Sequence, residues 1–126
     1  MADLKEKGIA LLSSTSSVDM KTAASTTLFN VPADKIAYIT TVVIRDPSAS
    51  MAGGTDFDFT EWKQNVNLSS LTTSGTDYIV LYGGAILDGD PIKYKEQANS
   101  AAFQITVATG TSASCTATID VFGYLV

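Results

Sequence analysis

Apolar and polar residues alternate with a period of two over most of the chain, which predicts β-strands and almost no helix. The longest such run, Lys35–Arg45, is rich in β-branched residues. Its even-numbered residues from Ile36 to Ile44 would share one face, and its odd-numbered residues the other. Both faces are largely apolar or β-branched, so we expect a central strand covered by a layer on each side. The strand candidates are Leu28–Val31, Lys35–Arg45, Thr55–Trp62, Asp77–Leu81, Asp90–Lys95, Ala102–Ala108 and Ala113–Leu125.

Turn signals separate these strand candidates along the chain. Pairs such as Gly53-Gly54 and Ser74-Gly75 are typical of tight turns. Short strands separated by turns at this spacing are typical of an antiparallel sandwich, including the jelly roll. We therefore expect an all-β fold, an antiparallel β-sandwich with jelly-roll topology. Val126 directly follows the last expected strand, so the C-terminus should be tied into a sheet.

The first 26 residues differ from the rest in pattern. They predict an N-terminal arm and first strand region, 1–26, followed by a β-sandwich domain, 27–126. Leu4–Leu12 fits a weak helix or an extended segment, and Ser13–Ser17 reads as a flexible polar spacer. Such an arm is either a frayed terminus or a segment that orders against a neighbouring subunit. The candidates for contact with another subunit or a capsid are Leu4, Ile9, Leu11, Leu12 and Trp62.

Composition and charge exclude several classes of protein. A chain of 126 residues with 45% hydrophobic and 17% charged residues predicts one globular domain. The formal net charge of -5 and the scattered basic residues disfavour binding to nucleic acid or to anionic lipid. The N-terminal sequence shows neither a signal peptide nor a membrane span, so we expect synthesis in the cytoplasm and no membrane partner.

Few residue types with catalytic chemistry are present. The absence of histidine excludes Ser-His-Asp and Cys-His triads and histidine zinc sites. Cys115 is the only cysteine, so no intrachain disulfide can form, and its place in an expected strand predicts a buried thiol. No phosphate-binding loop, dinucleotide fingerprint or nucleophile elbow occurs. We expect no catalytic, cofactor or metal site, and no cofactor.

Carboxylates are the remaining candidates for catalysis. Asp56 and Asp58 would lie on one strand face, about 7 Å apart, with Glu61 nearby. Paired carboxylates can hydrolyse a glycosidic bond. The solvated face of a strand whose other face carries Phe57 and Phe59 explains the same pattern.

Two further patterns admit a binding role. Asp88-Gly89-Asp90 would contribute oxygen ligands for Ca²⁺, although a tight turn needs the same residues. Aromatic residues stack on sugar rings and pack at interfaces, but they also fill cores. The aromatic candidates for a sugar-binding face are Trp62, Tyr78, Tyr82, Tyr94 and Tyr124.

Two segments of the chain resemble small structural proteins of tailed bacteriophages. Residues 27–44, TLFNVPADKIAYITTVVI, resemble the TLYTVPAGKTAxVxSIxV opening of these proteins. Residues 83–107 resemble their later segment, in which a Gly-Asp turn precedes the closing strands. The resemblance covers most of the chain from 27 to 126. The chain departs from it at Asp34, where Gly is usual, and at 97–99 (QAN).

This resemblance implies a non-enzymatic virion component. A small β-sandwich of this kind binds the outside of a capsid as a decoration (cement) protein, or forms part of the tail. The expected partners are the major capsid protein or other virion proteins and copies of the chain itself, with a trimer favoured. A carbohydrate-binding tail or fibre module and a carboxylate hydrolase that uses Asp56, Asp58 or Glu61 stay open as alternatives.

Overall fold

A computed structural model describes residues 9–60, 65–82, 92–95 and 101–126. These residues form β-strands and no helix, so none of them forms a helix that could cross a membrane. Each of the strands expected from the sequence overlaps an observed strand. The strands are β1 (Ala10–Asp19), β2 (Ser25–Asn30), β3 (Ile36–Arg45), β4 (Asp56–Phe59), β5 (Tyr78–Tyr82), β6 (Ile92–Lys95), β7 (Ala102–Thr109) and β8 (Thr116–Leu125).

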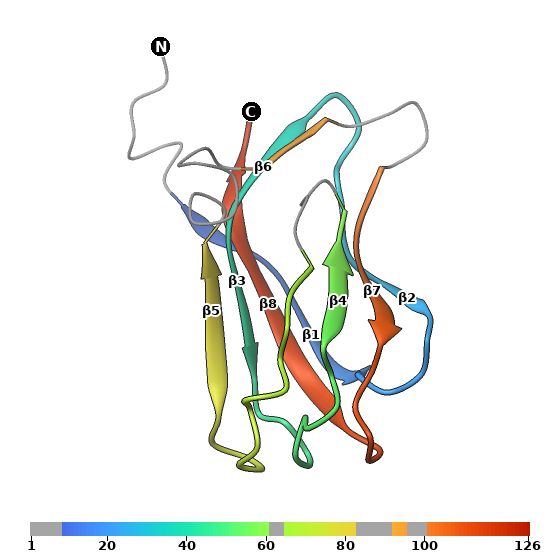
Figure 1. The fold of residues 1–126 in the computed structure, drawn as a ribbon. Helices are drawn as coiled ribbons and strands as arrows, with labels where there is room; N and C mark the ends of the chain where they lie inside the picture. Colours follow the sequence, from blue (N-terminus) through green and yellow to red (C-terminus); the bar gives the residue numbers. More distant parts are fainter. Residues whose placement is uncertain (1–8, 61–64, 83–91, 96–100) are drawn as a thin grey trace.

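The strands form two sheets that face each other (Figure 1). Sheet A has the order β1-β8-β3-β5, with β6 also paired to β3, and sheet B has the order β2-β7-β4. Every strand pairing is antiparallel. The expected antiparallel β-sandwich is confirmed. The first five strands alternate between the sheets, which is compatible with a jelly roll, and that topology stays a prediction.

The central strand β3 differs from its sequence-based description. A register shift against β8 lies between Ile39 and Thr41. Such a bulge adds one residue and reverses the facing of those that follow. Ala37 and Ile39 before the bulge and Val42 and Ile44 after it are therefore the buried residues. The single-face assignment is wrong, and so is the expected second covering layer, because the other residues of β3 are half-exposed.

The serine-rich segment near the N-terminus also differs from the structure expected for it. Ser13–Ser17 lies inside β1, which pairs with β8 from Ala10↔Gly123 to Asp19↔Thr116, so it is not a flexible spacer. Two register shifts interrupt β1, and they removed the alternation that would have predicted it. The boundary expected at residue 27 falls inside β2. The division into arm and domain stays a prediction, since residues 1–8 lie outside the described residues.

Side chains from both sheets form the core. The rings of Phe59 in β4 and Phe103 in β7 stack with centroids 5.9 Å apart. Cys115 is buried, as expected, and its thiol lies 3.4 Å from the Ala49 carbonyl oxygen. The largest fully buried side chains are Phe57, Phe103, Met20, Ile39, Ile44, Met51, Leu68, Ile105, Ile119, Val31 and Val42.

Backbone hydrogen bonds fix the start of β3. The Val126 amide donates to the Ile36 carbonyl (2.9 Å), and the Ile36 amide donates to the Val126 carbonyl (3.0 Å), which confirms that the C-terminus is tied into a sheet. In the turn before β3, the Lys35 amide donates to the Pro32 carbonyl (3.2 Å). Asp34 in that turn has a φ of 61°, the left-handed region that favours Gly. The positive φ thus suits Gly, the usual residue at this place in the phage proteins that the segment resembles, where this chain has Asp.

Candidate interaction surface

The two sheets present different outer faces, and sheet B has the polar one. Asp56 and Asp58 of β4 point away from the core because Phe57 and Phe59 between and beside them are buried. On β2 and β7, hydroxyl and amide side chains form cross-strand hydrogen bonds. Ser25 and Thr106 hydroxyls lie 2.8 Å apart, and the Gln104 amide donates to the Thr27 hydroxyl at 3.1 Å. This face is suited to contact with water.

The outer face of sheet A carries aromatic and aliphatic side chains. Tyr38 of β3 and Tyr124 of β8 stack with ring centroids 5.0 Å apart and planes 5° apart. The neighbouring positions follow from the registers of β1, β8, β3 and β5. The cross-strand rows are Leu11–Phe122–Thr41–Tyr82, Ser14–Asp120–Val43–Val80 and Thr118–Arg45–Tyr78.

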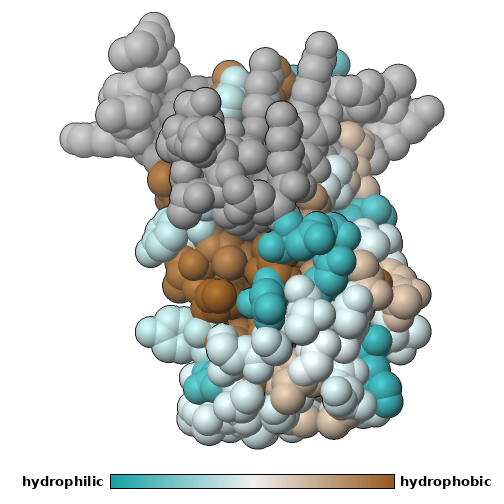
Figure 2. Space-filling model, viewed as in Figure 1, coloured by the Kyte–Doolittle hydropathy of each residue, from teal (hydrophilic) through white to brown (hydrophobic). Residues whose placement is uncertain are grey.

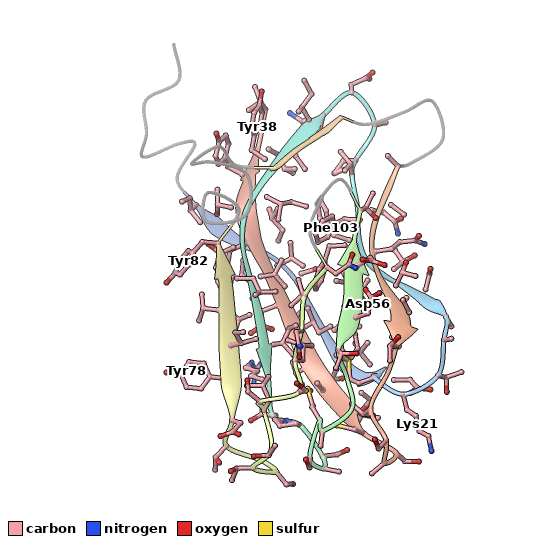
Figure 3. All side chains as sticks on the ribbon, in the orientation of Figure 1. Lys21, Tyr38, Asp56, Tyr78, Tyr82 and Phe103 are labelled. Carbon is pink, nitrogen blue, oxygen red and sulfur yellow. The ribbon has the colours of Figure 1, made fainter. Side chains whose placement is uncertain are left out.

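The most exposed part of this face is β5. Tyr78 is 65% exposed and Tyr82 is 56% exposed, and both side chains point away from the sandwich in Figure 3. The three residues between them are half-exposed. Figure 2 shows hydrophobic side chains gathered over β5 and toward β4, beside the residues drawn in grey, whereas Tyr78 and Tyr82 point to the other side of β5 in Figure 3. A solvent-exposed row of this kind is typical of a surface that binds another molecule.

One charged group is buried within the apolar face. Asp120, 8% exposed, accepts hydrogen bonds from Arg45 Nε (2.8 Å) and from the Ser14 hydroxyl (2.5 Å). Arg45 also bonds Asp46 through Nη1 (2.6 Å). Burial raises the pKa of Asp120, but the hydrogen bonds from Arg45 and Ser14 and the Arg45 charge outweigh it, and the pKa lies below its ordinary value. The Arg45 charge thus compensates the burial of the Asp120 carboxylate.

Sequence reasoning missed this pair of residues. Arg45 and Asp120 are separated by 75 positions, and only the pairing of β3 with β8 brings them together. A signal was present, because Asp120 stands alone among the apolar residues of its strand. An acidic residue in such a strand predicts a basic partner, but it does not say which one.

The residues predicted for contact fall into three groups. Ile9 and Leu11 are 63% and 54% exposed, and Leu11 lies opposite Phe122, on the outer face of sheet A. Leu12 is half-buried and packs against the core, so it offers less surface for contact. Leu4 and Trp62 lie outside the described residues. Contact by any of these residues stays a prediction.

The aromatic candidates divide in the same way. Tyr78 and Tyr82 are exposed, and Tyr124 is half-exposed in its stack with Tyr38. The side chains of Trp62 and Tyr94 lie outside the description. The sequence could name these residues, but it could not place them on a common face.

The acidic candidates show little of a catalytic site. Asp56 and Asp58 are adjacent on the outer face of β4, and burial together with the Asp56 charge raises the pKa of Asp58. One Asp56 oxygen, Oδ1, is buried with no hydrogen-bond partner in the part of the chain that the structure describes. In that same part, no three acidic or cysteine side chains gather as metal ligands would. Glu61, Asp88 and Asp90 lie outside it.

Comparison with known proteins shows the fold. No family model matches the sequence, and no curated protein sequence matches it. A chain of the solved structure "Cyanophage Pam1 capsid asymmetric unit" is similar, with a TM-score of 0.54 and 16% sequence identity. The likeness covers 94% of this chain and 85% of that chain. At this identity it supports a shared fold, and the two chains share it over nearly their whole length.

Proposed function

We propose that this protein is a non-enzymatic structural component of a bacteriophage virion. The observation that carries the proposal is the fold likeness to a chain of a cyanophage capsid asymmetric unit, over most of both chains. The resemblance of residues 27–44 and 83–107 to small phage structural proteins supports the same reading independently. Within the virion, we favour the role of a decoration (cement) protein on the outer capsid surface.

The two outer faces suit a protein that works by covering a surface. The aromatic and aliphatic side chains on the outer face of sheet A would be buried against virion partners, while the hydroxyl-rich face of sheet B stays in water. A protein that buries apolar area on the shell stabilises the shell conformation to which it binds. Trimeric assembly is part of the proposal, because three linked copies bind more tightly than one through multivalency. The major capsid protein is the proposed partner, and the virion the proposed location after synthesis in the host cytoplasm.

The test uses particles of the virus that encodes the chain. Peptide mass spectrometry should find the chain in purified particles. Particles made without it should release their DNA at a lower temperature, and added protein should restore the release temperature. Absence of the chain from particles, or particles equally stable without it, would overturn the proposal.

Matched variants connect this test to the surface. Tyr78→Ser with Tyr82→Ser removes the exposed rings of sheet A, and we expect it to weaken the rescue. Ser25→Ala with Thr27→Ala changes the outer side of sheet B by a similar number of groups and should rescue normally. Equal rescue by both double variants would mean that β5 does not contribute to shell binding.

A tail or fibre module that binds carbohydrate is the alternative, and the exposed rings of Tyr78 and Tyr82 favour it, since tyrosine rings stack on sugars. A glycan array should then show a specific sugar signal that Tyr78→Ala or Tyr82→Ala removes. No signal on any glycan counts against this alternative and leaves the decoration role in place.

A further inference from the structure

Strand β5 is an edge strand without the usual protection. No described residue pairs with its outer edge, whereas its inner edge pairs with β3 from Arg45↔Tyr78 to Thr41↔Tyr82 without a register shift. Natural edge strands carry charges, prolines or bulges that prevent pairing with another chain. The sequence of β5, YIVLY, contains neither a charge nor a proline. As far as the described residues go, its edge can therefore accept another strand.

The sequence of β5 identifies the strand that fits. We propose that β5 pairs antiparallel with β5 of a second copy of this chain, about a two-fold axis at Val80. YIVLY reads almost the same in both directions. Tyr78 would lie opposite Tyr82 of the second copy, and Ile79 opposite Leu81 of the second copy. Aromatic and β-branched or aliphatic pairs of this kind stabilise antiparallel strands.

This register also keeps the faces of the two copies together. Residues directly opposite each other in an antiparallel pair share a face. With Val80 on the axis, the tyrosines of both copies lie on one continuous outer face, and Ile79 and Leu81 continue the inner one. A slip by one residue would place a tyrosine opposite an aliphatic residue and turn the second copy over. The central register is thus the one that matches both faces.

The charges near β5 allow two copies to meet. The chain has a net charge of -5, so most surfaces of two copies repel each other. β5 itself is uncharged, and the Asp77 carboxylate that precedes it is held by the Thr73 amide at 2.8 Å. On the same face, the Arg45 cation is paired with both Asp120 and Asp46. The strand that a second copy would meet therefore carries no charge of its own.

The area available sets the strength of the contact. With Tyr78 and Tyr82 65% and 56% exposed, and about 150–250 Å² for a whole aromatic side chain, the four tyrosines would bury at most roughly 400–600 Å² in total. A specific stable interface buries about 1,200 Å² or more. The pair should be weak and concentration-dependent in solution. A trimer formed through other surfaces would keep one free β5 edge on each copy, so the two contacts are compatible.

A cysteine placed on the axis provides the test. Val80 and Val80 of the second copy would have Cα atoms about 4.5–5.5 Å apart, within the range that a disulfide spans. Val80→Cys should therefore form a covalent dimer under oxidised glutathione. Val43→Cys is the control, because Val43 is the neighbour of Val80 in β3 and lies one strand further from the edge. The natural Cys115 is buried and should not react.

A mixed experiment tests the register. Tyr78→Cys alone should cross-link poorly, since residue 78 of one copy would lie opposite residue 82 of the second copy, four residues away from residue 78 of that copy. Mixed with Tyr82→Cys, it should give a heterodimer at least tenfold faster. Sedimentation of Val80→Lys should show at least tenfold weaker self-association with an unchanged unfolding temperature, because two ammonium groups would meet at the axis.

These experiments use the purified protein alone, so their outcome does not depend on the proposed virion role. Dimer formation by Val80→Cys well above that of Val43→Cys, with the predicted 78–82 preference, supports the proposal. Equal cross-linking of Val80→Cys and Val43→Cys at about 100 µM protein, a concentration at which micromolar pairs are populated, overturns it. Tyr78→Cys that cross-links to itself as fast as to Tyr82→Cys overturns the register.

Discussion

Gly123 lies where β8 passes β3, and its replacement by Ala should destabilise the protein strongly. A Cβ atom at this position would lie 2.1 Å from the carbonyl oxygen of Tyr38, 3.0 Å from its carbonyl carbon and 3.1 Å from the Ile39 Cα. All three atoms belong to the backbone of β3, so no side-chain rotation can relieve the contact. The position is next to Tyr124, whose ring stacks on Tyr38.

The size of the effect follows from how far the strands must separate. Contacts of a Cβ below 3.0 Å essentially never occur, so the strands must move apart by about 1 Å, enough to break hydrogen bonds that weaken beyond about 3.2 Å. Loss of one or two such bonds costs about 1 kcal/mol each. Overpacking in a buried site adds about 1–3 kcal/mol. We expect a loss of about 2–4 kcal/mol in the free energy of unfolding, a large part of the 5–15 kcal/mol typical of a domain.

Urea unfolding followed by circular dichroism measures this loss. The midpoint should fall while the dependence on urea concentration stays unchanged. Gly75→Ala is the matched control, because a Cβ there meets no atom within 4 Å, although Gly75 has a φ of 77°. Its cost should be the conformational one alone, about 1 kcal/mol.

Two results would refute the reasoning. Gly123→Ala within about 0.5 kcal/mol of the wild type would mean that β8 and β3 do not approach as closely as the structure shows. Equal losses for Gly123→Ala and Gly75→Ala would mean that loss of glycine flexibility, rather than the contact with Tyr38, sets the cost.

Substitutions at three further positions test the electrostatics and the turn. Asp120→Asn should lower the free energy of unfolding by about 1–2 kcal/mol at pH 7, because it weakens the bond to Arg45. Since the folded pKa of Asp120 is lowered, this loss should fade as pH falls through that pKa. Urea unfolding from pH 7 to pH 3 measures the loss, and a loss that stays constant with pH would contradict the prediction. Asp58→Asn should stabilise the protein by about 0.5 kcal/mol at pH 7, because it removes the repulsion between Asp58 and Asp56. The folded pKa of Asp58 is raised, so this gain in stability should vanish below pH 4. No gain at neutral pH would refute the repulsion between the two carboxylates. Asp34→Gly should leave the unfolding temperature nearly unchanged, whereas Asp34→Val should lower stability by about 1 kcal/mol or more because of the positive φ. Equal stabilities of the two variants would count against the turn geometry.

The candidate surface was only partly predictable. The sequence named the exposed residues Ile9 and Leu11 and included Tyr78 and Tyr82 among possible contact aromatics. It could not tell exposed tyrosines from core ones, because a tyrosine in an alternating strand fits either face. Which face meets water depends on where the second sheet lies.

By itself, the sequence determined the strands. Alternation is local, so the positions of β2 to β8 could be read from it, and the turns between them from Gly, Pro and Asp. For β1 the sequence predicted only a first strand region within 1–26 and not its bounds, because its bulges break the alternation. Only the tertiary structure decided which residues of β3 face the core, because the bulge after Ile39 depends on pairing with β8. The same pairing brings Arg45 to Asp120, since strand partners far apart in sequence are selected by the whole sheet and not by either strand alone.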